Sequence, residues 1–348
     1  MTENKINVCV LGASGYTGSD FIRLAARHPH INITALTAHA HAGKEMAEVF
    51  PHLSILDLPR LTKLEEVDFS AIDAVVCGLP HGTTQKLISE LPDTIKVVDM
   101  SADFRLRDAD TYEKTYGKPH QAQELQKSAA YGLTELNRED IKKARLVACP
   151  GCYPTATLLV LSPLLESAVI STEDIIIDAK SGVTGAGRGL KQNTLFSEAG
   201  EGLSPYSVGV HRHAPEIEQE LTKSSGQNIV VNFTPHLIPM SRGELVTCHV
   251  KLTKGATVDD LRQTLTKQYQ AEPFVRILPE NTMPATQHVR GSNQCQIAVF
   301  KDRIPGRAIV IGVIDNLVKG SAGQALQNFN LMFGLEETLG LEQLPMFP

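Results

Sequence analysis

The chain has 348 residues, of which 42% are hydrophobic and 21% are charged, and it carries a formal net charge of −6. This composition is typical of an ordinary globular protein, and the length favours two domains over one. Because lysines and arginines are scattered and no apolar stretch approaches the ~20 residues that span a bilayer, we expect neither nucleic acid nor a membrane as partner.

The first residues, MTENKINVCVLGASG, enter a strand pattern within a few positions and lack the basic and apolar segments of a signal peptide. Six cysteines are spread through the chain, at positions 9, 77, 149, 152, 248 and 295. In a large chain without a signal peptide, this distribution favours reduced thiols over a disulfide framework. We therefore expect a cytoplasmic protein.

Residues 5–150 alternate short β-branched runs with helical stretches. The runs are INVCVLG, NITALTA, DAVVCGLP, IKVVDMS and RLVACPG. Strands that alternate with helices in this way predict a parallel sheet built from βαβ units, which is the Rossmann-type arrangement of dinucleotide-binding domains.

From about residue 151 to 318 the strands come closer together, with few helices between them. EDIIIDAKSG, IVVNFTPHLI, ELVTCHVKL, QCQIAVF and RAIVIGVID predict a mixed or antiparallel sheet in a second domain. The following segment, KGSAGQALQNFNLMFG, has apolar residues at the spacing of one helical face and is expected to pack back on the first domain. The predicted class is α/β, with residues 1–150 and 319–348 forming a dinucleotide-binding domain and residues 151–318 an α+β second domain.

Three glycines, Gly12, Gly15 and Gly18, lie between the first strand and the first helix. Glycines let the backbone approach a pyrophosphate closely, and a helix N-terminus offers it N–H groups, so the segment predicts a dinucleotide site. The spacing is G-x-x-G-x-x-G, and a simple tight turn is the alternative. The second strand leads into LTAHAHAGKE, with no carboxylate at the strand end and with His39, His41 and Lys44 close by, which favours NADP over NAD. The alternative is that these histidines are merely exposed loop residues.

Two cysteines flank a Pro-Gly pair before an apolar helical stretch, in ACPGCYPTATLLVLSPLLE. Because proline suits the first helical turn, Pro154 predicts a helix start at about Tyr153, which places Cys152 at the positive end of the helix dipole. The dipole gives a thiolate ~0.3–1 kcal/mol, less than one pKa unit, so a basic partner such as an imidazole is also needed. Cys149 is expected to close the preceding strand as a buried thiol. A redox pair, a zinc site and inert thiols are the alternatives, and we expect no metal because no second ligand pair follows.

YSVGVHRHAPEIEQEL places His211 and His213 in a short segment that we expect to be extended, with both side chains on one side of the chain. One of them could serve as acid/base. KSGVTGAGRG contains several glycines after a strand of the second domain and predicts a substrate loop. Arg188 in that loop, and Arg105 in DMSADFRLRD, could hold an anion, although surface arginines are more often in solvated ion pairs.

Together these motifs resemble the N-acetyl-gamma-glutamyl-phosphate reductases, arginine-pathway enzymes related in fold to aspartate-semialdehyde dehydrogenases. The resemblance covers nearly the whole chain, and the family's motifs occur in order: GASGYTG, LPHG, SADFRL, YGLTELNR, PGCYPT, SGVTGAGR, HRHAPEI, TPHLIPMSRG and DNLVKGSAGQALQN. The family often has Ser-Arg where this chain has Ala38-His39, and commonly another residue at Cys149.

The resemblance implies a role for individual residues. By position, Cys152 is the nucleophile, and the acid/base comes from His211 or His213. The cofactor would contact Gly12, Ser14, Gly15, Tyr16, Thr17, Gly18, His39, Pro80, Gly185 and Asn316. The substrate would contact Arg105, Arg188 and His211.

The implied reaction is the NADPH-dependent reduction of N-acetyl-gamma-glutamyl phosphate to N-acetylglutamate 5-semialdehyde through a Cys152 thioester. The resemblance also implies a homodimer or homotetramer, with residues 151–318 as the catalytic and oligomerisation domain. Two other functions stay open at this stage. One is the same chemistry on a longer acyl phosphate of the lysine pathway, and the other is a non-catalytic NADP-binding redox sensor that uses Cys149 and Cys152.

Overall fold

The computed structural model describes residues 5–348, and the chain divides into two compact units. The first unit extends to Pro150 and includes Ser321–Glu342, while the second comprises Gly151–Gly320 and Gln343–Pro348. Within the described residues, none of the helices has the length and apolar character needed to cross a membrane.

The first unit is built on a seven-stranded sheet in which every pairing is parallel. In spatial order the strands are β3 (Leu61–Thr62), β2 (Ile31–Thr37), β1 (Ile6–Leu11), β4 (Ala74–Cys77), β5 (Lys96–Asp99), β7 (Leu146–Ala148) and β6 (Ala130–Tyr131). The central strands are apolar at consecutive positions because helices cover both faces of a parallel sheet. The strand order reverses between β1 and β4, which is where such sheets bind nucleotides.

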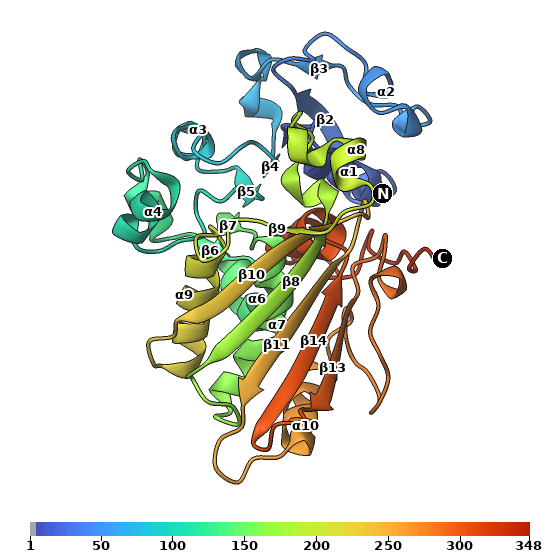
Figure 1. Ribbon diagram of the computed structural model, residues 1–348. Coiled ribbons are helices and arrows are strands. Elements are labelled where there is room, and N and C mark those ends of the chain that lie inside the picture. Colours follow the sequence, from blue (N-terminus) through green and yellow to red (C-terminus); the bar gives the residue numbers. More distant parts are fainter. Residues whose placement is uncertain (1–4) are drawn as a thin grey trace. The chain divides into compact units, whose positions relative to one another are not determined.

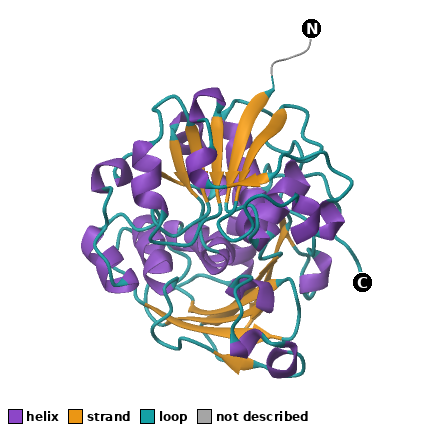
Figure 2. Ribbon diagram, turned by 90° about the horizontal axis from the view of Figure 1, so that it is seen from above, coloured by secondary structure: helices purple, strands orange, loops and turns teal. Residues whose placement is uncertain are grey.

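Helices connect and flank these strands, as Figure 2 shows on either side of the sheet. They are α1 (Tyr16–Ala25), α2 (Met46–Val49), α3 (Thr84–Glu90), α4 (Ala109–Tyr116), α5 (Gln123–Gln126), α6 (Thr134–Lys143) and α11 (Gly323–Met332), with 3₁₀ turns at Pro51–Leu53, Leu64–Glu66 and Phe69–Ala71. Although α11 lies near the end of the chain, it contacts α6, α1 and β5. The packing expected from its apolar face is thus confirmed.

The second unit is built on a mixed seven-stranded sheet (Figure 1). Its strands, in spatial order, are β12 (Val275–Ile277), β13 (Cys295–Lys301), β14 (Arg307–Ile314), β11 (Glu244–Lys251), β8 (Ile175–Gly182), β10 (Val231–Ile238) and β9 (Ser204–Pro205). Buried and partly exposed residues alternate along β11 and β10, the pattern of a sheet with one covered face. Helices α7 (Cys152–Glu166), α9 (Ala214–Ser225) and α10 (Val258–Tyr269) contact this sheet.

The remaining elements of the second unit are short. They are the helix α8 (Phe196–Ala199), the 3₁₀ turns Val183–Ala186, Gln192–Thr194 and Thr286–His288, and the π-helix Val318–Ala322 that follows β14 and leads into the first unit. Every strand of four or more residues was predicted from the sequence. The short strands β3, β6, β9 and β12 were not, because two or three residues carry too little periodicity to distinguish them from loops.

Helix α7 is apolar on all sides because it is buried on all sides. It lies between β11 and β14 of the sheet and the helices α9 and α10. Its close approach to β14 depends on Gly312, where a Cβ would lie 2.8 Å from a methyl of Val160. The helix that carries Cys152 is thereby fixed in the core of the second unit.

Candidate active site

The site is centred on the start of α7. The helix begins at Cys152, one residue earlier than predicted, and Gly151 is its N-cap without a side-chain capping bond. Cys152 is partly exposed, whereas the other five cysteines are buried. The first-turn N–H groups have no carbonyl one turn earlier in the helix, so this end attracts negative charge such as a thiolate or an oxyanion.

The backbone at this start is held by α9. The N–H of Gly151 donates to Oε1 of Glu216, 2.9 Å away. A Cβ on Gly151 would lie 2.5 Å from Nε2 of His213, so the imidazole packs directly on the residue that precedes the thiol. Likewise, a Cβ on Gly320 would lie 2.7 Å from Cβ of Cys152. Glycine at both positions lets the imidazole and the π-helix approach Cys152.

His211 and His213 lie side by side, although not for the reason expected. The segment is a turn that leads into α9, not an extended strand, so that expectation was wrong. The backbone N–H of His213 donates to Nδ1 of His211 over 3.1 Å, and the two ring centroids are 4.8 Å apart. Burial, helped by the charge of Arg212, lowers the pKa of His211 to about 4. His211 is therefore a neutral imidazole at pH 7 whose hydrogen is on Nε2.

Aromatic side chains surround the histidine pair. Tyr153, Tyr206 and Phe233 each stack edge-on against His211 at centroid distances of 5.3–5.8 Å. The Tyr206 hydroxyl donates to the Tyr153 hydroxyl over 3.2 Å. This packing keeps the rings in place and lowers the local dielectric, which strengthens hydrogen bonds made to a reacting group.

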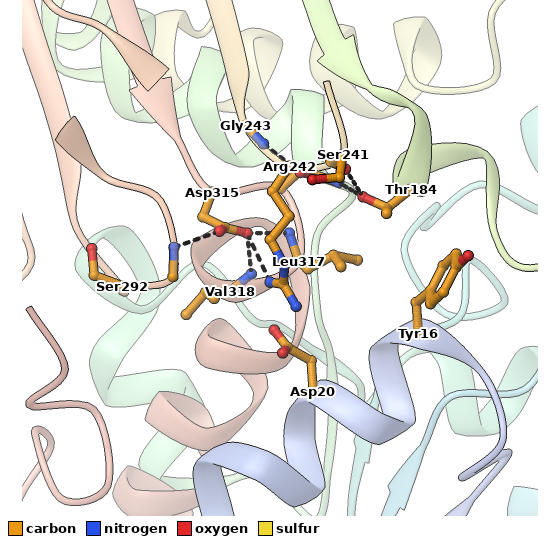
Figure 3. A network of polar contacts seen from close by, with 12 residues as sticks. Tyr16, Asp20, Thr184, Ser241, Arg242, Gly243, Ser292, Asp315, Leu317 and Val318 are labelled. Atoms are coloured by element: carbon orange, nitrogen blue, oxygen red, sulfur yellow. Dashed lines mark hydrogen bonds and ion pairs between the residues drawn. The ribbon is translucent and has the colours of Figure 1, made fainter. Parts of the chain in front are cut away.

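A second cluster orders the loops beside β11 and β14 (Figure 3). Asp315 is fully buried and accepts hydrogen bonds from the N–H groups of Leu317 and Val318 and from Gly291, at 2.7–3.1 Å. It also forms an ion pair with Arg242 at 3.4 Å. The carboxylate thus fixes the start of the π-helix and the guanidinium together.

Asn316 links two of the predicted loops. Its Oδ1 accepts from the N–H of Gly243, and its Nδ2 donates to Oγ1 of Thr184. A Cβ on Gly185 would lie 3.9 Å from Nδ2 of the same asparagine. The structure thereby brings Gly185 and Asn316 together, and their contacts with the cofactor stay predictions. Arg188 lies farther along this loop and is exposed.

The glycine turn of the first unit fits a dinucleotide. Gly12 has φ of +74°, and a Cβ there would lie 2.7 Å from the Gly78 carbonyl oxygen. A Cβ on Gly18 would lie 2.6 Å from the Gly12 carbonyl oxygen. Gly15 is the N-cap of α1, with no side-chain capping bond and no acidic residue in the first turn. The helix N-terminus and the close backbone packing are those that a pyrophosphate requires.

The other predicted cofactor residues lie near this turn or in loops after the strands. Ser14, Tyr16 and Thr17 are partly exposed at the start of α1, while His39 and Pro80 are exposed after β2 and β4. These placements are compatible with cofactor contacts, and their roles stay predictions.

Arg105, in the segment after β5, contacts Cys149, which follows β7. Arg105 is buried, and its guanidinium donates to the carbonyl oxygens of Cys149 and Met100 at 2.7 and 2.9 Å. This bonding gives Arg105 a structural task, and its contact with substrate stays a prediction. Burial raises the pKa of the Cys149 thiol to about 12, so it is not a thiolate at neutral pH.

Several polar residues of the site were not predicted from the sequence. They are Glu216, Tyr206, Arg242, Glu244 and Asp315. Of these, only Glu216 carried a usable signal, because it follows His213 by three residues in the first turn of a helix. Tyr206 lies only five residues before His211, whereas Arg242, Glu244 and Asp315 reach the site through β11 or through loops distant in sequence.

Comparisons with known proteins agree with this arrangement. The semialdehyde dehydrogenase NAD binding domain model matches residues 7–144, and the semialdehyde dehydrogenase dimerisation domain model matches residues 152–316. A probable chloroplastic N-acetyl-gamma-glutamyl-phosphate reductase of Arabidopsis thaliana is 57% identical over 99% of this chain and 86% of its own. The N-acetyl-gamma-glutamyl-phosphate reductase of Rhodospirillum rubrum is 54% identical over 99% of this chain and 100% of its own.

The chain belongs to the N-acetyl-gamma-glutamyl-phosphate reductase family. The resemblance drawn from the motifs is thus confirmed. Aspartate semialdehyde dehydrogenase II of Vibrio cholerae has a fold similar to that of this chain. The TM-score is 0.73 at 18% identity, over 95% of this chain and 99% of that chain. The aspartate semialdehyde dehydrogenase with NADP from Candida albicans has a TM-score of 0.68 at 16% identity over 95% and 99%. These likenesses confirm the predicted α/β class with its mixed second sheet.

Proposed function

We propose that this chain reduces N-acetyl-gamma-glutamyl phosphate to N-acetylglutamate 5-semialdehyde with NADPH, in arginine biosynthesis. The observation that carries the proposal is the partly exposed Cys152 at the uncapped start of α7, with the His213 imidazole packed on the preceding glycine. A thiolate at that position is both stabilised by the helix and reachable by an acyl group.

In the proposed mechanism the Cys152 sulfur attacks the acyl carbon of the substrate. A carbon–sulfur bond forms, the carbon–oxygen bond to phosphate breaks, and inorganic phosphate leaves with the bonding electron pair. His213 takes the thiol proton before the attack, since its ring lies beside Gly151. N–H groups at the start of α7 stabilise the negative oxygen that develops on the carbonyl.

The second half releases the aldehyde. When bound, NADPH would supply the hydride that reduces the Cys152 thioester. His211, neutral and carrying its hydrogen on Nε2, donates a hydrogen bond to the same carbonyl oxygen, and the thiohemiacetal then collapses to the semialdehyde and the Cys152 thiolate. The glycine turn from Gly12 to Gly18 would hold the pyrophosphate, and His39 would lie near the 2′-phosphate of NADP.

Assembly and location belong to the same proposal. A match to a family model described as a dimerisation domain supports an oligomer built on the second unit, and we propose a homodimer or homotetramer. The cytoplasmic location expected from the cysteines stays a proposal, and the Arabidopsis relative is described as chloroplastic.

One assay tests reaction, substrate and cofactor together. Phosphate-dependent reduction of NADP by N-acetylglutamate semialdehyde should be fast, and reduction of NAD should be slow. Cys152→Ser should lose at least ~10³-fold in kcat because no other group forms the thioester. Cys149→Ser is the matched control and should keep most of the activity, since that thiol is buried and protonated.

Other outcomes would contradict the proposal in different ways. A preference for the substrate that is one carbon longer would assign the lysine-pathway reaction. Equal loss in both cysteine variants, with a reversible disulfide between the two residues, would favour a redox sensor.

A further inference from the structure

Glu244 is a buried carboxyl group at the base of the site. It is the first residue of β11, with Ile314 of β14 and Ser181 of β8 as its neighbours in the sheet register. Its side chain is on the same face as Val246 and Cys248, because alternate residues of a strand share a face, and α7 contacts β11. Its exposed fraction is 0%.

The Glu244 oxygens lack the hydrogen-bond donors that usually offset the cost of burying a carboxyl group. Neither carboxylate oxygen has a partner at ordinary hydrogen-bond geometry. Its polar neighbour is the Cys152 thiol, whose proximity favours the charged form of Glu244 and so acts against the effect of burial. Burial dominates and raises the pKa of Glu244 to about 8. At neutral pH the carboxyl therefore holds its proton and is a hydrogen-bond donor.

The other titratable groups around Glu244 do not favour its ionisation. They are the Cys152 thiol, the hydroxyl groups of Tyr153 and Tyr206, and the buried carboxylate of Asp315. Of the cations on adjoining segments, Lys319 lies over the Phe274 ring, 5.9 Å from its centroid, and Arg242 is paired with Asp315 at 3.4 Å. A negative charge on Glu244 would thus add to the charge of Asp315 and to that of a Cys152 thiolate.

Two neighbouring acids do not both ionise readily, because the negative charge of one raises the pKa of the other. When Cys152 becomes a thiolate, the arrangement of lowest energy is the one in which Glu244 keeps its proton and directs it at the sulfur. Because a hydrogen bond to a charged acceptor is about twice as strong as a neutral one, this contact favours the thiolate over the thiol. The helix dipole alone lowers the pKa of the Cys152 thiol by less than one unit. A further hydrogen-bond donor is therefore required to stabilise the thiolate at neutral pH.

We propose that the protonated carboxyl of Glu244 donates a hydrogen bond to the Cys152 sulfur and stabilises its thiolate form. The inference rests on the proposed role of Cys152 as nucleophile, and it adds a residue that acts through that sulfur. Glu244 is thus a positioning residue for the reactive thiol, which touches neither substrate nor cofactor in this role.

The test is the pH dependence of Cys152 alkylation by iodoacetamide in the protein without substrate or cofactor. Mass spectrometry locates the modified residue, and the five buried cysteines serve as internal references. Glu244→Met keeps the volume but removes the donor, so the apparent pKa of alkylation should rise by about one unit and the rate at neutral pH should fall about tenfold. Glu244→Gln keeps an N–H donor and should stay close to wild type.

The opposite sign would overturn the inference. If Glu244 were ionised beside Cys152, removal of its charge would lower the apparent pKa in both variants and speed alkylation. Equal pKa values in all proteins would also overturn it. Glu166→Gln, at the exposed far end of α7, is the matched control, and circular dichroism compares the folding of the variants. Because alkylation needs no substrate, the result is independent of whether the proposed reaction is correct.

Discussion

Burial keeps His211 neutral, and one hydrogen bond to its ring is compatible only with that neutral form. Its Nδ1 accepts the His213 N–H, so a proton can bind there only when that bond is broken. Burial acts in the same direction and lowers its pKa to about 4 from 6.5. The folded protein consequently binds fewer protons at this site than the unfolded chain between pH 6.5 and 4. The stabilisation is present above pH 6.5 and is lost as the pH falls to about 4.

A stability measurement checks this assignment. We expect the unfolding free energy of wild type to fall between pH 7 and pH 4 by about 2 kcal/mol more than that of His211→Gln, after a discount for partial exposure. His28 and His120, whose pKa values burial also lowers, contribute equally to both proteins and cancel in the difference. His52→Gln, an exposed control, should follow wild type. A wild-type curve parallel to that of His211→Gln would refute a neutral His211.

Single residues were easier to single out from the sequence than the groups that surround them. Cys152, His211 and His213 became candidates because the helix start and the H-x-H spacing are local in the chain. Glu244 was missed because its partners in the sheet register, Ile314 and Ser181, lie 70 and 63 positions away in the chain. Sequence periodicity describes which face of a strand is apolar, but not which thiol a glutamate on that face will meet.

Helix α7 contains a proline in its last turns, and the fold compensates for it. Pro163 has no N–H, so the carbonyl of Leu159, four residues earlier, lacks its usual donor inside the helix. The hydroxyl of Tyr269, in α10, donates to that carbonyl oxygen over 2.7 Å. Since both residues are buried, the tyrosine satisfies a group that would otherwise be costly to bury.

A double-mutant cycle tests this compensation. Tyr269→Phe should lower the unfolding free energy by about 1–3 kcal/mol, because it leaves the Leu159 carbonyl buried without a donor. Pro163→Ala restores a backbone N–H at the right position, so the same tyrosine change in that background should cost clearly less. Urea unfolding of the four proteins gives the coupling energy. Equal costs in the two backgrounds would show that Tyr269 acts through packing alone.

Elements were predicted in proportion to their length and periodicity. The long strands of both sheets and the amphipathic α11 follow from β-branched runs and from helical spacing. Short β9, only Ser204–Pro205, exists because it pairs with Leu237 and His236 of β10, which a local pattern does not reveal. The turn at His211–His213 was mistaken for an extended segment for a different reason, because its shape depends on a local side-chain bond to the backbone that apolar periodicity does not reveal.

At the scale of the whole molecule, the two faces of the second sheet differ. Val310 and Gly312 of β14 are buried on the face that α7 covers, where Gly312 meets Val160. Ile309 and Ile311 alternate with them and are partly exposed on the opposite face. In the register, Ile309 lies opposite His249 of β11, which is also partly exposed. This face therefore combines isoleucines with polar side chains, a composition suited to contact with another protein surface.

We expect a second copy of the chain to cover this face in the proposed homo-oligomer. Ile309→Lys would place a charge among apolar side chains of the interface, and the cost of burying it should shift the protein to monomers. Light scattering coupled to size exclusion gives the mass, and thermal unfolding shows whether the variant is folded. Ile304→Lys, at an isoleucine 57% exposed in the turn between β13 and β14, is the matched control and should keep the wild-type mass. If folded Ile309→Lys retains the oligomeric mass, the contact must use a different surface, because a buried lysine without a partner at this position could not leave association unchanged.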